Sequence, residues 1–229
     1  MKKIGMVGGT AWVSTVEYYS AICALGADSD MQPEFSIESI DNARAQSYIG
    51  VHGDEASWER FDAYHRDALL RVERSGAEVA FLAANTPHHR FEAITAGVDI
   101  PVVNIVDAVA RVCHDDGIDR LLLLGTALTM SSATIRHRFA ARGIEAIAPP
   151  ERERSAIVER IERLQRGDDE GAIVHITRLA NGHRAVALAC TELPLAFPDE
   201  RRSASFEREG VRYLNTLAIH AQAVFDYAR

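Results

Sequence analysis

The regular alternation of apolar strand-like runs with helical patterns is the sequence feature that most restricts the fold of this chain. Short apolar runs such as AEVAFLAANT (77–86) and RLLLLGTAL (120–128) alternate with helical stretches such as ASWERFDAYHRDALLRVERSG (56–76). Strands separated by helices are typical of parallel sheets whose two faces are covered by helices. The sequence therefore predicts an α/β protein.

The alternation is also duplicated along the chain. The first half has strand ends at VGGT (7–10) and AANT (83–86), and the second half has them at LLGT (123–126) and ACTE (189–192). Ligands of open α/β sheets bind outside the carboxyl ends of the strands. We therefore expect two similar Rossmann-like lobes with an active site in the cleft between them. Residues 1–105 plus 208–229 are expected to form the first lobe, including a C-terminal helix, and residues 106–207 the second.

Composition and charge exclude several function classes. The 229 residues carry a net charge of -8, and Lys and Arg are scattered, which argues against binding nucleic acid through its phosphates. No apolar run approaches the roughly 18 residues of a membrane span. KKIGMVGG (2–9) reads as a first strand and not as a signal peptide. We therefore expect a cytoplasmic protein that binds neither nucleic acid nor membranes.

The three cysteines differ in their surroundings. Cys23 and Cys113 lie in apolar helical patterns, where a buried structural role is expected, and no CxxC pair suggests a metal site or a disulfide framework. Cys190 instead ends an apolar run, just before an expected helix start whose dipole could favour its thiolate. The alternative is that Cys190 is another buried cysteine.

Polar residues follow several of the expected strands. Asn85, Thr86 and Thr191 offer neutral hydrogen-bond donors suited to a carboxylate. Gly9 and Thr10, with Ser14 as the expected N-cap of the next helix, could receive an anion, or the glycines could simply make a tight turn. Because neither G-x-G-x-x-G nor a Walker A lysine is present, a nucleotide-binding module is disfavoured.

Five motifs, in order along the chain, together resemble the aspartate/glutamate racemase family: MVGGTAWVSTVEYY, AANTPH, LLGTALTM, ACTELPL and NTLAIHA. The resemblance implies two α/β lobes related by a pseudo-twofold axis and a homodimer. It also implies a small-molecule carboxylate or amino-acid substrate, no cofactor (in particular no pyridoxal phosphate) and no metal. In this family one cysteine from each lobe removes or returns the substrate α-proton.

Carried onto this chain, the resemblance makes Cys190 the cysteine of the second lobe, whereas the first-lobe position holds Ala84. His88 is then the best candidate for a second catalytic group, because its unperturbed pKa suits proton transfer, although it could instead cap a helix. Two further family positions also differ, with Ala156 in place of a lysine and Asn215 in place of an aspartate. The expected substrate-binding residues are Gly9, Thr10, Ser14, Asn85, Thr86, Thr126, Thr191, Glu192 and His220.

Three functions remain open at this point. The first is an amino-acid racemase that abstracts the α-proton with Cys190. The second is a single-cysteine carbanion enzyme, either a decarboxylase or an isomerase working on one face, which would suit a methyl group at position 84. The third is a catalytically inactive homologue that binds carboxylates.

Overall fold

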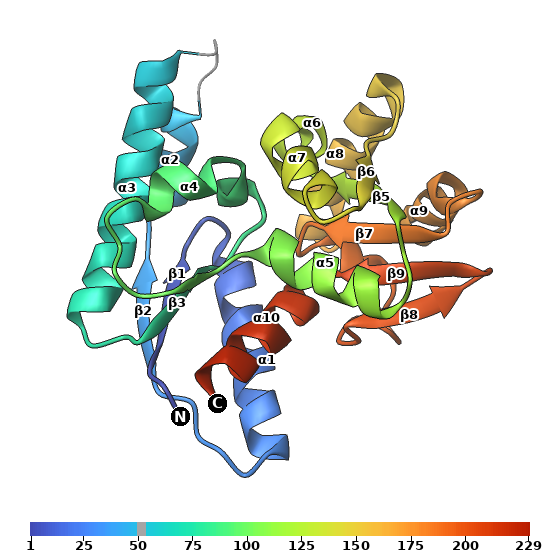
Figure 1. Cartoon of the computed structure of the whole chain (residues 1–229). Helices are drawn as coiled ribbons and strands as arrows, with labels where there is room; N and C mark the ends of the chain where they lie inside the picture. Colours follow the sequence, from blue (N-terminus) through green and yellow to red (C-terminus); the bar gives the residue numbers. More distant parts are fainter. Residues whose placement is uncertain (50–53) are drawn as a thin grey trace. The chain divides into compact units, whose positions relative to one another are not determined.

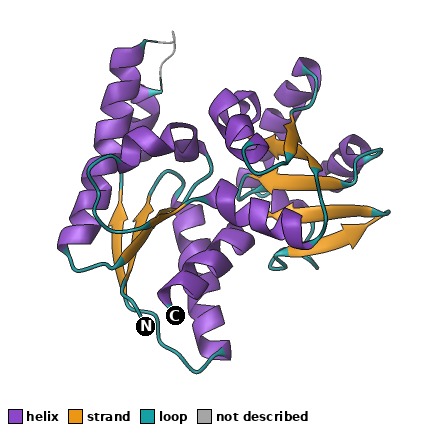
Figure 2. Cartoon of the chain, viewed as in Figure 1, coloured by secondary structure: helices purple, strands orange, loops and turns teal. Residues whose placement is uncertain are grey.

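The computed structural model describes residues 1–49 and 54–229 (Figure 1). The chain divides into two compact units. The first unit comprises Met1–Asn104 and Ala221–Arg229, and the second comprises Ile105–His220. Each unit contains one sheet with helices around it (Figure 2). The expected α/β fold with two sheets of mostly parallel strands is confirmed.

The sheet of the first unit has four parallel strands in the order β2-β1-β3-β4. These are β1 (Ile4–Gly8), β2 (Phe35–Ser39), β3 (Val79–Leu82) and β4 (Val102–Val103). The two central strands, β1 and β3, are buried along their whole length, as expected for parallel strands covered on both faces. The carboxyl ends of β1 and β3 therefore lie side by side.

The helices of the first unit are α1 (Trp12–Asp28), α2 (Asn42–Tyr48), α3 (Glu55–Arg74) and α4 (Phe91–Thr95), with the short 3-10 helix η1 (Thr86–Arg90) before α4. The buried stripe of α3, which includes Phe61, Leu69 and Val72, packs in one apolar cluster with residues of β1 and β3. Helix α1 begins at Trp12, with Ala11 as its N-cap. The prediction that Ser14 caps this helix was wrong, because Ser14 lies in the first turn of the helix and is buried.

The sheet of the second unit has five strands in the order β6-β5-β7-β9-β8. They are β5 (Arg120–Gly125), β6 (Glu145–Ile147), β7 (Ala185–Ala189), β8 (Ser205–Arg208) and β9 (Val211–Asn215), of which only β8 runs antiparallel to its neighbour. The helices are α5 (Ile105–Asp115), α6 (Ala127–Ser131), α7 (Ala133–Ala140), α8 (Glu151–Gln165), α9 (Ala172–Ala180) and the 3-10 helix η2 (Leu193–Ala196). Helix α10 (Thr216–Ala228) begins in the second unit and ends in the first.

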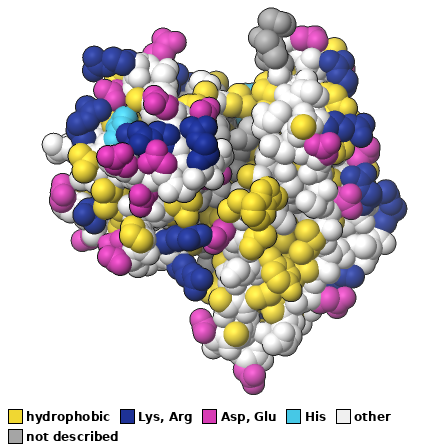
Figure 3. Space-filling model, turned by 180° about the vertical axis from the view of Figure 1, so that it is seen from behind, with side chains coloured by type: hydrophobic (Ala, Val, Ile, Leu, Met, Phe, Trp, Pro, Cys, Tyr) yellow, Lys and Arg dark blue, Asp and Glu magenta, His cyan; other side chains and the backbone are white. Residues whose placement is uncertain are grey.

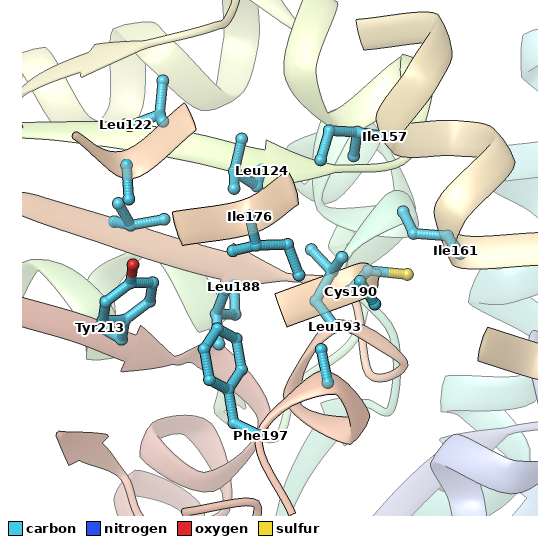
Figure 4. Packing of buried hydrophobic residues seen from close by; sticks show 14 of the residues in the cluster. Leu122, Leu124, Ile157, Ile161, Ile176, Leu188, Cys190, Leu193, Phe197 and Tyr213 are labelled. Carbon is cyan, nitrogen blue, oxygen red and sulfur yellow. The ribbon is translucent and has the colours of Figure 1, made fainter. Parts of the chain in front are cut away.

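The core of the second unit forms between this sheet and helices α8 and α9. Side chains of β5 and β7, such as Leu124 and Leu188, pack with Ile157 of α8 and Ile176 of α9 (Figure 4). Cys190 belongs to the same cluster, and its sulfur points away from most of the labelled side chains (Figure 4). The apolar core thus reaches the residue that follows β7.

The boundary between the units differs from the expected one. The expectation placed residues 208–229 with the first unit, but β9 pairs in parallel with β7 and in antiparallel with β8, so it belongs to the second sheet. Only Ala221–Arg229 return to the first unit. The β8–β9 turn at Glu209 and Gly210 has two residues with positive φ, of 51° and 76°.

No helix within residues 1–49 and 54–229 is long and apolar enough to cross a membrane.

Candidate active site

Cys190 lies directly after β7, a strand of small and branched apolar residues that is buried throughout. Ala189 pairs with Gly125 at the end of β5, so Cys190 and Thr126 follow two adjacent strand ends. A Cβ atom on Gly125 would lie 2.5 Å from the carbonyl oxygen of Ala189, so only glycine permits this close approach. The sequence motifs LLGT and ACTE are thereby brought together, as predicted from their strand-end positions.

Glu192 is the centre of the hydrogen bonds around Cys190. Its Oε2 accepts from Cys190 Sγ at 2.8 Å and from Thr191 Oγ1 at 2.9 Å. Its Oε1 accepts from Gln165 Nε2, at the end of α8, at 2.9 Å. Because Glu192 is 5% exposed, these bonds offset the loss of solvation of its carboxylate. One hydrogen-bonded group is thus formed by four residues, Cys190, Thr191, Glu192 and Gln165.

Gln165 was not expected in the site. It stands 27 residues before Glu192 and ends an ordinary amphipathic helix. No local motif marks it, since its contact depends on how α8 packs against the segment after β7. The proximity of α8 to η2 could be found only once the tertiary structure was known.

The protonation of Cys190 differs from the expectation. Burial is the largest cause that raises its pKa well above the usual value, and the negative charge and hydrogen bond of Glu192 raise it further. Backbone N–H groups of Glu192 and Thr191 oppose this without reversing it. Cys190 therefore rests as a neutral thiol, and the expected dipole-favoured thiolate was wrong because burial and the nearby Glu192 carboxylate outweigh the backbone N–H groups that favour the thiolate.

Thr126 caps a helix next to this group. Its side chain accepts a hydrogen bond from the backbone N–H of Thr129 at 3.2 Å, which makes it the N-cap of α6. Its hydroxyl also lies 3.0 Å from the hydroxyl of Thr129. Thr126 is half-buried. Its capping role explains a threonine at this position, and its expected role in substrate binding stays a prediction.

The Gly-Gly turn after β1 is sterically constrained. Gly9 has φ of 91°, and a Cβ atom there would lie 2.1 Å from the carbonyl oxygen of Ile40. Its backbone N–H donates to the hydroxyl of Thr15 at 2.9 Å. The N–H group expected to receive an anion is therefore used within the turn, and Thr10, which follows it, is half-buried.

Ala84, Asn85 and Thr86 follow β3 at the neighbouring strand end. Val7 of β1 pairs with Leu82 of β3, and the N–H of Ala83 donates to the carbonyl of Val7 at 2.8 Å. Ala84 is 8% exposed and Asn85 is 9% exposed. The structure thus brings the GGT and AANT motifs together within the first unit, as expected from their strand ends.

His88 lies in the interior of the first unit. It is 1% exposed, and its ring stacks on Phe91 with the ring centroids 5.4 Å apart and an interplanar angle of 8°. Its backbone N–H donates to the carbonyl of Asn85 at 3.1 Å, which closes the first turn of η1. His220 in α10 is likewise fully buried. Stacking on Phe91 accounts for the position of the His88 ring, and the expected roles of both histidines at the substrate stay predictions.

No group of three or more His, Cys, Asp or Glu side chains that could hold a metal ion occurs among the described residues.

The chain is similar to a known protein family and to several solved structures. The model of the Asp/Glu/Hydantoin racemase family matches residues 7–224. An aspartate racemase homologue from Pyrococcus horikoshii OT3 is 31% identical with a TM-score of 0.81, covering 100% of this chain and 99% of that one. A proposed Asp/Glu racemase from Yersinia pestis is 29% identical with a TM-score of 0.84 and the same coverage.

A more distant structure shares the fold. The aspartate racemase of Picrophilus torridus is 22% identical with a TM-score of 0.73, covering 99% of this chain and 94% of that one. The family match spans nearly the whole chain and includes both strand-end groups described above. The protein belongs to the Asp/Glu/Hydantoin racemase family.

Proposed function

We propose that this protein is a cofactor-independent amino-acid racemase in which Cys190 is the acid/base on one face of the substrate. The observation that carries the proposal is the hydrogen bond of 2.8 Å from Cys190 Sγ to Glu192 Oε2 at the end of β7. It pairs a proton donor with a proton acceptor at the place where α/β folds bind ligands. Membership of the family supports the reaction class.

The Cys190–Glu192 pair provides for proton transfer in both directions. To protonate a planar carbanion, the S–H bond of Cys190 breaks and its proton goes to the substrate Cα, which leaves a thiolate. To abstract a proton, the thiol first passes its proton to Glu192 Oε2, and the resulting thiolate takes the α-proton. Because burial and Glu192 raise the pKa of the thiol, the thiolate forms only when the thiol passes its proton on, and Glu192 Oε2 is the acceptor in contact with it.

Besides an acid/base, the reaction requires hydrogen-bond donors for the substrate carboxylate, and neutral donors lie at the strand ends. The α-proton of an amino acid is very weakly acidic, so the carbanion needs donors on the α-carboxylate, where charge develops. The hydroxyl of Thr191 already donates to Glu192, whereas Asn85 and Thr86, in the AANT motif that resembles the family, offer an amide and a hydroxyl. We propose that Asn85 and Thr86 supply such donors to the carboxylate of a small amino acid.

A one-face carbanion enzyme is the second candidate, and Ala84 is the observation that favours it. The residue that follows β3 at this position is a buried methyl group, 8% exposed, which cannot carry a proton. With Cys190 alone, a carbanion would be protonated from one side, as in a decarboxylase or a one-face isomerase. In a racemase, another group or a water molecule would have to serve the second face.

Exchange of the substrate α-proton in deuterated water tests both candidates. L- and D-amino acids and substituted malonates are incubated with the protein and followed by NMR, with the Cys190→Ala variant as control. Deuterium at Cα with inversion is the result expected of a racemase. Exchange with retention, or loss of carbon dioxide, would identify one-face chemistry. Ligand-induced stabilisation against heat without any exchange would contradict both and indicate a carboxylate-binding protein.

A further inference from the structure

The second unit contains a cavity between one face of α9 and the β8–β9 turn. Its volume is about 360 Å³. Pockets that bind small molecules usually measure about 300–1,000 Å³, so the cavity can hold a small ligand. The residues of its α9 wall are separated by one or three positions and so share one face of the helix: Ile173, Val174, Thr177, Arg178 and Asn181.

This cavity lies at the end of the sheet opposite Cys190. Cys190 follows the carboxyl end of β7, whereas Ala185, the first residue of that strand, pairs with Arg212, near the β8–β9 turn. The five residues of β7 alone span roughly 16 Å. A ligand in the cavity would therefore be separate from any substrate at Cys190.

Two side chains of opposite charge, Arg208 and Glu209, form the wall that the β8–β9 turn provides. Within the part of the chain that the structure describes, neither side chain takes part in an ion pair or a hydrogen bond. On the α9 wall, by contrast, Arg178 Nη2 donates to Glu153 Oε2 at 2.9 Å, which offsets its charge. Arg208 and Glu209 are thus the charged groups that remain for a ligand.

The pair of opposite charges indicates the class of ligand. A simple anion such as phosphate would be repelled by Glu209, and a simple cation would be repelled by Arg208. Acidic, basic and hydrophobic side chains are also interspersed on the face of the second unit seen at the left of Figure 3. A ligand that carries one positive and one negative group would satisfy both side chains with charge-assisted hydrogen bonds.

The α9 wall adds an apolar surface. Val174 is 70% exposed, and Ile173 beside it is half-buried. Small-molecule sites typically combine such apolar walls with a few polar groups that fix the orientation of the ligand. An apolar side chain on the ligand would cover Ile173 and Val174 and remove their surface from water.

Two buried hydroxyls lie at this wall. The Oγ1 of Thr177, which lines the cavity, and the Oη of Tyr213 are buried without a hydrogen bond of good geometry in the described part of the chain. Burial raises the pKa of Tyr213, Glu209 raises it further, and Thr177 and Arg208 lower it, so its hydroxyl is close to these three side chains. Buried polar groups usually have a partner, and a helical threonine populates two rotamers. Thr177 can therefore turn its hydroxyl to a ligand.

We propose that the cavity between α9 and the β8–β9 turn binds a small apolar amino acid as its zwitterion. An α-amino acid carries its ammonium and its carboxylate on one carbon, which suits two charged side chains that are adjacent in the sequence. Glu209 accepts from the ammonium, Arg208 donates to the carboxylate, and the apolar side chain rests on Ile173 and Val174. The proposal does not depend on the catalytic role of Cys190.

Calorimetric titration of the full chain with L-leucine tests this site. Leucine should bind the wild type, and Arg208→Gln and Glu209→Gln should each raise its dissociation constant at least tenfold, because each removes a charge-assisted hydrogen bond. Arg202→Gln and Glu207→Gln are the matched controls, since both residues are exposed nearby and neither lines the cavity. Both controls should bind leucine as the wild type does, and circular dichroism checks that every variant is folded.

Analogues of leucine test the chemistry of recognition separately. 3-Methylbutylamine lacks the carboxylate and 4-methylpentanoate lacks the ammonium, so each should bind at least tenfold more weakly than leucine. The absence of leucine binding at millimolar concentrations would overturn the proposal. Binding that both Arg208→Gln and Glu209→Gln leave unchanged would also overturn it, because leucine would then occupy another site. Equal binding of leucine and 4-methylpentanoate would show a site for anions and would contradict it as well.

Discussion

Replacing Arg90 by methionine should destabilise the first unit by an amount that the structure allows us to estimate. Arg90 is the last residue of η1, the 3-10 helix that also contains Thr86 and His88. Its Nε and Nη2 atoms contact both carboxylate oxygens of Asp62 in α3 at 2.7–3.2 Å, and Nη2 also contacts Glu55 at 2.6 Å. The Arg90–Asp62 ion pair therefore holds η1, the segment after β3, against helix α3.

The loss of unfolding free energy in Arg90→Met can be estimated from the burial of the ion pair. The side chain of Asp62 is 5% exposed and that of Arg90 is 21% exposed. Removing one partner of a buried ion pair costs about 3–5 kcal/mol, because a carboxylate is left without compensation. Since water reaches part of Arg90, we expect about 3 kcal/mol. In a protein of this length, about 3 kcal/mol lowers Tm by roughly 6–12 °C.

Thermal and urea unfolding followed by circular dichroism measure this loss. The double variant Arg90→Met/Asp62→Asn should recover most of the stability, because the buried charge is removed together with its partner. Arg152→Met is a surface control, since that side chain is 90% exposed, and should change stability by less than about 0.5 kcal/mol. The reasoning is refuted if Arg90→Met costs less than about 1 kcal/mol, or if the double variant is no more stable than the single one.

Three further predictions concern the strand ends and the cysteines. Gly9→Ala should cost at least about 1–3 kcal/mol in urea unfolding, because of the φ of 91° and the contact with Ile40, and unchanged stability would contradict the described turn. Gln165→Leu should slow α-proton exchange about tenfold, because Glu192 loses the bond that orients it, and an unchanged rate would remove Gln165 from the site. Burial raises the pKa of Cys113 from 9.0 to about 12, so its thiol stays neutral in the folded state when the unfolded chain ionises. Stability should therefore fall by roughly 1.4 kcal/mol per pH unit between pH 9 and 12, and Cys113→Ala should show a correspondingly shallower decline over that range.

The parts of the fold that sequence patterns predict best are the central strands. Runs such as VAFL (79–82) and AVALA (185–189) are buried on both faces, so they are apolar without alternation and stand out between helical patterns. Their positions also predict which polar residues meet at the strand ends. This is why the strand ends LLGT and ACTE of the second unit were expected to lie together, as the pairing of Gly125 with Ala189 confirms.

The parts that could not be predicted depend on long-range packing or on weak local signals. The β8–β9 hairpin is mostly polar, and its assignment to the second sheet depends on the pairing of β9 with β7. Ser14 is not the N-cap because α1 begins at Trp12, three residues earlier than a cap at Ser14 would require, with Ala11 as its N-cap. The neutral state of Cys190 depends on burial and on Glu192, which folding brings against the thiol.

The most direct test of the proposed function compares α-proton exchange in deuterated water between the wild type and Cys190→Ala, on the substrate that the wild type exchanges fastest. Cys113→Ala is the matched control, because it also removes a buried thiol but lies in α5. The account predicts that Cys190→Ala lowers the exchange rate at least about 100-fold, the usual contribution of a positioned acid or base, and that Cys113→Ala leaves it nearly unchanged. Equal exchange by Cys190→Ala and the wild type would contradict it.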